Sequence, residues 1–136
     1  MLSMDELLMG KKMEELDQNI QDNLPKLLEQ VNKIRVLWGK PMTPTSVVRT
    51  MSEHLAIYAK KGITDKKKIP MKSKHLFGEA CDIYDPDLSL TDWLKSNPQI
   101  MEDCNVFCES GNKNWVHFQI VPFGSYKDGG TRWFNP

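Results

Sequence analysis

Two short segments of the chain, Ser73–Tyr84 and Glu109–Gln119, contain most of the residues that could do chemistry. The first contains His75 and Asp82, and the second contains His117. Imidazole nitrogens and carboxylate oxygens bind catalytic zinc, and three protein ligands leave a fourth position open for water. These residue types therefore predict one zinc ion, Zn(2+), bound by His75, Asp82 and His117.

The geometry of β-strands gives these residues a reason to converge. Successive side chains of a strand point to opposite faces, so Asp82 and His117 each face away from their apolar neighbours. If both apolar faces pack on helices, Asp82 and His117 project from one open face of a sheet. His75 would join them from the preceding turn, where Gly78 gives the backbone the freedom to turn sharply around an ion.

Four further residues of reactive type receive other interpretations. His54 lies beside Glu53 in a helical segment, and a lone histidine is more often exposed or hydrogen-bonded than a metal ligand. We therefore interpret His54 as a surface residue. Cys81, Cys104 and Cys108 are too many for one pair and match no Cys-x-x-Cys pattern, so we expect free thiols.

The N-terminal part of the chain is expected to be helical. Ser3 and Glu6 have the spacing of a capping box that starts a short helix. Asn23 and Pro25 mark the start of a second helix, which Gly39 ends as a left-handed cap. The apolar residues that give this second helix a core-facing side are Leu24, Leu27, Leu28, Val31 and Ile34.

The remaining chain alternates strands, helices and loops. Prolines and β-branched residues between Lys40 and Arg49 predict a short strand that ends near Arg49. Ser89 and Asp92 predict a capped helix that Asn97 ends before a proline. The other predicted elements are a helix over 52–61, a surface loop over 63–72, a helix over 98–104, strands over 106–108 and 115–121, and an irregular stretch from Pro122.

These elements predict an α+β fold in one domain, residues 1–136. Helices of the N-terminal part, 1–39, pack on a small, mainly antiparallel β-sheet. The sheet and the metal site belong to residues 40–136, and the zinc site lies on the open face of the sheet.

Charge and hydropathy limit the classes of function. Eighteen basic and eighteen acidic residues cancel, so we expect no nucleic acid partner. No apolar run approaches the ~18 residues of a membrane span or the core of a signal peptide. We therefore expect synthesis in the cytoplasm without an export signal, no membrane insertion, and a monomer. A lysine-rich stretch over 60–74 is more typical of a solvated loop than of a site for an acidic polymer.

The two metal segments also resemble a known family. The pattern Ser73-x-His75-x-x-Gly78-x-Ala80-x-Asp82-Ile83, followed by Trp115-x-His117, closely resembles the zinc D-alanyl-D-alanine carboxypeptidase and L-alanyl-D-glutamate endopeptidase family. Short members of this family include bacteriophage endolysins and virion lysins. The likeness extends to Asp22-Asn23-x-Pro25, Gly39-Lys40-Pro41, Ser46-x-x-Arg49 and Arg132-x-Phe134-x-Pro136.

The resemblance implies an enzyme, a zinc metallopeptidase that hydrolyses a peptide bond in the stem peptide of bacterial peptidoglycan. It assigns the two histidines and the aspartate to the ligand positions. It also implies that Arg49 binds a substrate carboxylate or polarises the scissile carbonyl, a role that suits a permanently charged fork of donors. Ser46 and Ser73 are expected to add hydrogen bonds to the substrate or to the residues around it.

The general base is where the chain departs from the simpler family pattern. Many relatives have an acidic residue three positions before the last histidine, but here that residue is Asn114, whose amide cannot take a proton at neutral pH. Glu109, eight positions before that histidine, could reach the metal if 110–112 forms a hairpin. We therefore predict Glu109 as the base, ahead of the less favoured acids Asp85, Glu102 and Asp103.

The resulting hypothesis is a cell-wall hydrolase released by a holin-type route or carried on a virion. The sequence leaves open which bond is cut, and its brevity favours the L-alanyl-D-glutamate endopeptidase. Two alternatives stay open. The first is a non-catalytic zinc module of the same fold, which Asn114 favours; the second is a small phage structural protein.

Overall fold

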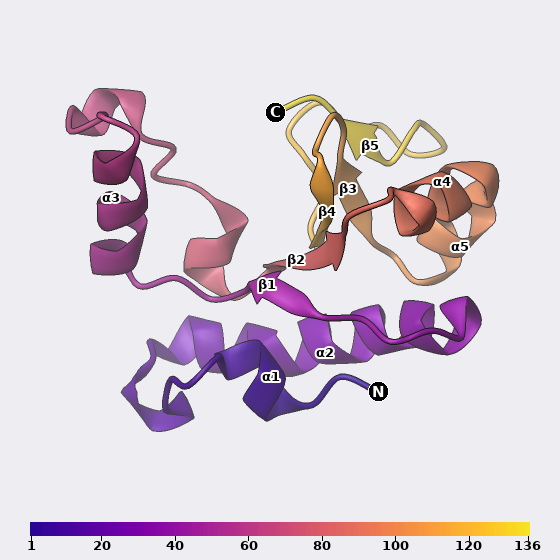
Figure 1. Cartoon of the computed structure of the whole chain (residues 1–136), viewed down its shortest axis with the longest axis horizontal. Coiled ribbons are helices and arrows are strands. Elements are labelled where there is room, and N and C mark those ends of the chain that lie inside the picture. The colour runs from indigo at the N-terminus through magenta and orange to yellow at the C-terminus, as the bar shows by residue number, and fades with distance from the viewer.

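The computed structural model describes all residues from Met1 to Pro136. Figure 1 shows α2 running beneath the sheet, with α3 at one side of it and α4 and α5 at the other. None of the helices combines the length and the apolar character that crossing a membrane requires. The elements are α1 (Met4–Leu8), α2 (Gln18–Trp38), β1 (Pro44–Ser46), α3 (Met51–Lys60), β2 (Ala80–Asp85), α4 (Ser89–Ser96), α5 (Pro98–Asp103), β3 (Phe107–Glu109), β4 (Asn114–Gln119) and β5 (Trp133–Phe134), with 3-10 turns at Met13–Glu15, Lys66–Lys68 and Lys74–Phe77.

The five strands form one sheet in the order β1-β2-β4-β3-β5. All neighbours are antiparallel except β3 and β5, which run parallel. The predicted α+β class with a mainly antiparallel sheet is therefore confirmed. The C-terminal stretch was expected to be irregular throughout, and this was wrong for Trp133 and Phe134, which pair with Cys108 and Glu109.

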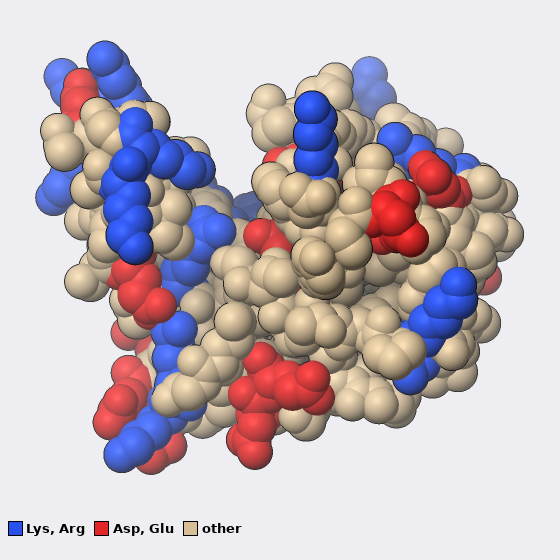
Figure 2. All heavy atoms as spheres, viewed as in Figure 1, with Lys and Arg blue, Asp and Glu red and all other residues tan.

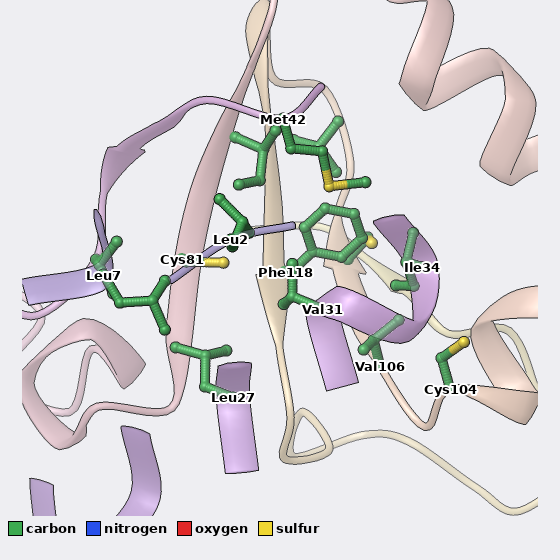
Figure 3. Packing of buried hydrophobic residues seen from close by; sticks show 14 of the residues in the cluster. Leu2, Leu7, Leu27, Val31, Ile34, Met42, Cys81, Cys104, Val106 and Phe118 are labelled. Atoms are coloured by element: carbon green, nitrogen blue, oxygen red, sulfur yellow. The ribbon is translucent and has the colours of Figure 1, made fainter. Parts of the chain in front are cut away.

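One face of the sheet packs on α2. Figure 3 shows Phe118 of β4 among side chains of α2 that include Val31 and Ile34. Apolar residues at helical spacing give α2 a buried side, and the inward residues of β2 and β4 meet it because side chains alternate along a strand. The buried residues of this contact are Ile20, Leu24, Leu27, Val31, Ile34, Cys81, Ile83, Val116 and Phe118.

The start of α2 differs from its prediction. The helix begins at Gln18 rather than near Asn23, and Pro25 lies inside it. The apolar spacing already includes Ile20, so burial extends the helix backward although proline removes one backbone donor. Asn23 therefore does not start the helix. Its side-chain amide donates to the carbonyl oxygen of Phe77 at 2.9 Å and connects α2 to the turn that contains His75.

The segment after β1 leaves the sheet earlier than expected. β1 ends at Ser46, whereas the strand was predicted to reach Arg49. The backbone of 47–49 turns instead toward His75: the backbone N–H of Arg49 donates to the His75 carbonyl oxygen at 3.1 Å. The carbonyl of Val47 lies 2.6 Å from the His75 ring. This segment thus holds the first predicted ligand from two sides.

The cap of α4 was also assigned wrongly. Ser89 is the first residue of the helix and does not cap it; Leu88 stands before it with φ 60°. Asp85, at the end of β2, accepts hydrogen bonds from the backbone N–H groups of Leu90 (3.0 Å) and Thr91 (2.9 Å). A carboxylate that accepts from the first free N–H groups of a helix performs the capping role from a distance.

Two other helices begin as the sequence indicates. Ser3 and Glu6 form the expected capping box of α1. α3 begins one residue before the predicted range and has its own capping box between Thr50 and Glu53. Its histidine, His54, is completely buried, so the interpretation as a surface residue was wrong. The carbonyl oxygen of Pro70, in the segment that follows α3, lies 2.8 Å from His54 Nε2.

Candidate metal centre

Asp82 and His117 are directly opposite each other in the register of β2 and β4. Their side chains lie on the face of the sheet that α2 does not cover, as strand alternation predicts. The distance between Asp82 Oδ1 and His117 Nδ1 is 2.9 Å. Two of the three predicted ligands therefore meet as a cross-strand pair.

His75 reaches this pair from the 3-10 turn Lys74–Phe77. Gly78 ends the turn with φ +69°, a backbone conformation that favours glycine. Its α-carbon also lies so close to α2 that an added Cβ would be 3.1 Å from Ile20 Cγ2. The turn brings His75 Nε2 to 3.3 Å from Asp82 Oδ1, so all three predicted ligands come together.

Hydrogen bonds fix which nitrogen of each imidazole faces the carboxylate. His75 Nδ1 lies 2.6 Å from the Val47 carbonyl oxygen, which can only accept, so Nδ1 carries the proton and Nε2 is free. On the other ring, His117 Nε2 lies 3.0 Å from the side-chain oxygen of Gln119. The Gln119 amide nitrogen donates to the Val121 carbonyl at 2.9 Å, and this sets the direction of the amide. Both free nitrogens therefore face Asp82.

The arrangement fits a metal ion. The three ligand atoms all lie within 4.8 Å of one another. His75 and His117 are 3% and 7% exposed, and the Asp82 side chain is 13% exposed. Two imidazoles, each with a hydrogen-bond partner behind the ring, and one carboxylate are the donor set of many catalytic metal sites. His75, Asp82 and His117 can thus hold a metal ion.

The negative charge of Asp82 also favours a cation. Burial alone would raise the pKa of Asp82, but His117 and His75, which donate to the carboxylate whenever their facing nitrogens are protonated, outweigh burial and hold that pKa well below its usual range. Burial lowers the pKa of His117, whereas the hydrogen bond and the charge of Asp82 raise it, and the net effect is a rise. Asp82 is therefore an anion at neutral pH, the form that binds a metal.

A cavity of about 680 Å³ opens in front of the three ligands. Its walls also contain three of the four other predicted functional residues, Arg49, Ser73 and Glu109, which come from three separate parts of the chain. Four aromatic side chains also line the cavity. These are Tyr58, Trp115, Phe123 and Phe134.

Glu109 reaches the cavity because β3 ends there and four residues return the chain to β4. Asn112, within this hairpin, orients the carboxylate when its amide is turned to satisfy both neighbours. In that orientation the amide nitrogen donates to Glu109 Oε1 at 3.0 Å, and the amide oxygen accepts from Trp115 Nε1 at 3.2 Å. Asn114 is exposed and does not line the cavity. The fold thus places Glu109 in the same cavity as His75, Asp82 and His117, as the sequence predicted.

The other acids considered as bases lie elsewhere. Asp85 is buried and caps α4. Glu102 and Asp103 belong to α5 and do not line the cavity. Among the acids named from the sequence as possible bases, Glu109 is the one that shares the cavity with His75, Asp82 and His117.

Arg49 brings an uncompensated positive charge to the same cavity. No carboxylate lies within ion-pair distance of its guanidinium. Its Nε is buried without a partner, and its Nη2 donates to Ser46 Oγ at 3.3 Å. Ser46 does not line the cavity, so its hydroxyl orients Arg49 rather than contacting a ligand there. A buried, unpaired donor of this kind is suited to an anionic group of a ligand.

Gln119 and Asn112 are the functional residues that sequence reasoning missed. A signal for Gln119 existed, because it follows His117 by two residues and so lies on the same face of β4. Asn112 had no such signal, since its contacts depend on the course of the hairpin.

Comparisons of the chain with family models, with curated proteins and with solved structures found no match.

Proposed function

We propose that this chain is a zinc-dependent peptidase that hydrolyses a peptide bond in the stem peptide of bacterial peptidoglycan. The observation that carries the proposal is the sharing of one cavity by the metal-binding triad, a carboxylate and an unpaired guanidinium. The resemblance of the two metal segments to zinc peptidases of the cell wall supplies the substrate class.

Zinc is the proposed ion because two imidazoles and one carboxylate form its common catalytic ligand set. His75 Nε2, Asp82 Oδ1 and His117 Nδ1 would be the ligand atoms. When bound, zinc supplies a Lewis acid that lowers the pKa of water and polarises a carbonyl group.

Glu109 is the proposed general base and acid. It takes a proton from the attacking water, whose oxygen forms the new bond to the scissile carbonyl carbon. As the carbon–nitrogen bond breaks, Glu109 returns the proton to the leaving amine. The Asn112 amide nitrogen donates to Oε1 of Glu109, so Oε2 is the oxygen that is free to carry the proton.

Arg49 is the proposed binder of negative charge. Its guanidinium lines the cavity without an acidic partner and presents donors that match either a substrate carboxylate or the oxyanion that develops at the scissile carbonyl. Ser73, at the cavity wall next to the turn of His75, would donate a hydrogen bond to the bound peptide. The volume of the cavity is within the usual range for ligand sites.

Mass spectrometry of defined soluble muropeptides tests the proposal. Protein with stoichiometric zinc should cleave them and protein treated with a chelator should not; the Glu109→Gln variant should retain zinc but lose cleavage. Glu102→Gln, an exposed change on α5, is the matched control and should remain active. Released D-alanine would identify a carboxypeptidase, and products split between L-alanine and D-glutamate would identify the endopeptidase.

Two results would contradict the proposal. Intact muropeptides in the presence of zinc-loaded protein would favour the non-catalytic zinc module. Protein that neither binds zinc nor cleaves muropeptides would leave a structural role.

A further inference from the structure

Positive charge is concentrated in one region of this neutral chain. Residues 60–74, from the end of α3 to the turn of His75, contain seven lysines and one acidic residue, Asp65. The rest of the chain contains eleven basic and seventeen acidic residues. Figure 2 shows Lys and Arg side chains gathered over α3 and the segment that follows it. We call these seven residues the lysine surface: Lys60, Lys61, Lys66, Lys67, Lys68, Lys72 and Lys74.

Nothing in the fold neutralises the lysine surface. The ion pairs that lysines form in this structure are Lys11–Glu53 and Lys33–Glu29, and neither involves it. Asp65 accepts from the backbone N–H of Lys67 at 3.0 Å, so its carboxylate caps the 3-10 turn Lys66–Lys68. All members except Lys74 are exposed. Clustered like charges repel one another, so the fold gains no stability from this grouping.

The lysine surface continues into the cavity of the metal centre. Lys72 and Lys74 line that cavity beside Ser73 and Arg49. Lys66, Lys67 and Lys68 lie outside it, on the exposed 3-10 turn. A polymer with one peptide in the cavity could therefore lie across the lysines with its neighbouring segments.

We propose that the lysine surface binds carboxylate groups of polymeric peptidoglycan next to the stem peptide that occupies the cavity. The polymer's identity rests on the proposed function. Lysine suits this task because its ammonium group is a mobile point charge on a flexible stem and needs no fixed geometry in its partner. Each exposed contact is weak and screened by salt, but several on one polymer act together.

The test uses a triple variant, Lys66→Ala, Lys67→Ala and Lys68→Ala, in the zinc-loaded full chain. The matched control is Lys12→Ala, Lys26→Ala and Lys127→Ala, which removes the same charge from exposed positions outside the lysine surface. Both sets are combined with Glu109→Gln so that the polymer stays intact. Binding is measured by co-sedimentation with peptidoglycan sacculi stripped of covalently attached polymers, so that stem-peptide carboxylates are the main anions.

The lysine triple variant should bind stripped sacculi about tenfold more weakly than the control at low salt, and the difference should shrink at high salt. Without Glu109→Gln, it should cleave soluble muropeptides as fast as the control. Equal binding by the two variants would overturn the proposal, as would lysine-dependent binding that appears only on unstripped sacculi with phosphate polymers attached. Lysine-dependent binding without any muropeptide cleavage would refute the proposed peptidase activity but support polymer binding by the lysine surface.

Discussion

The Nε2 atom of His117 lies 3.0 Å from the side-chain oxygen of Gln119, two residues farther along β4. The Gln119 amide nitrogen is bound to the Val121 carbonyl, so the amide cannot reverse without losing that hydrogen bond. The pair therefore keeps the Nδ1 lone pair of His117 directed at Asp82. Outer partners of this kind commonly set the affinity of a metal site.

Replacing Gln119 with leucine should weaken zinc binding about 10- to 100-fold, because the imidazole loses the acceptor that fixes its tautomer. Competition against a chromophoric chelator measures the affinity, and thermal melting checks the fold. Gln99→Leu is the control, since Gln99 is exposed on α5. Wild-type affinity in a folded Gln119→Leu protein would rule out this role.

Removing a ligand should abolish stoichiometric zinc. His75→Ala, Asp82→Asn and His117→Ala each take away one of three ligand atoms that lie within 4.8 Å of one another. Elemental analysis of dialysed protein gives the zinc content. His54→Gln should retain the metal, because His54 binds the Pro70 carbonyl outside the triad. Full zinc content in all three ligand variants would place the metal elsewhere.

Glu109→Gln should lower kcat for muropeptide cleavage about 100- to 10,000-fold, because the amide cannot accept the proton from water. Asn112→Ala should cause a smaller loss, since Glu109 keeps its carboxylate but loses the donor on Oε1. Steady-state kinetics on both zinc-loaded variants measures the effects. An active Glu109→Gln enzyme would require another base.

Arg49→Lys should reduce kcat/KM about tenfold or more although the charge is retained, because a single ammonium cannot replace paired guanidinium donors. The change also removes the donor to Ser46 Oγ. Kinetics with muropeptides measures the loss, and Arg35→Lys on α2 is the control because Arg35 does not line the cavity. Unchanged kinetics would show that Arg49 carries no substrate contact.

The buried His54 predicts a loss of stability in acid. Burial lowers the pKa of His54, the hydrogen bond with Pro70 opposes this, and the charges of Arg49 and His75 add to the fall. The unfolded chain then takes up the proton first as pH falls below the ordinary histidine pKa of about 6.5, so the free energy of unfolding decreases.

His54→Gln should flatten this dependence, because glutamine keeps a donor for Pro70 and does not titrate. Urea unfolding of both proteins between pH 7.5 and 5.5, with chelator present so that metal binding does not contribute, measures the slopes. Identical slopes would mean that His54 does not titrate differently in the two states.

Strand alternation made the Asp82–His117 pair predictable, because the backbone alone decides that the two residues share a face when both strands are buried on the other. His75, in a turn, was predicted through the family motif. His54 was not predictable in the same way. This residue contacts Pro70, sixteen positions farther along the chain, and the helical periodicity of α3 gives no information about such a contact. The prediction of the α4 cap was wrong for a related reason. The capping rule considers only residues next to the helix start and indicated Ser89, whereas Asp85, farther back in β2, accepts the hydrogen bonds.

Asp82 and His117 also belong to different strands and stand opposite each other in the β2–β4 register. A slip of one residue would turn one of them toward the core, so an ion that needs both is compatible with only one alignment of the strands. Metal loading and correct strand pairing should therefore stabilise each other. Backbone amides of β2 and β4 should exchange hydrogen more slowly once zinc is added.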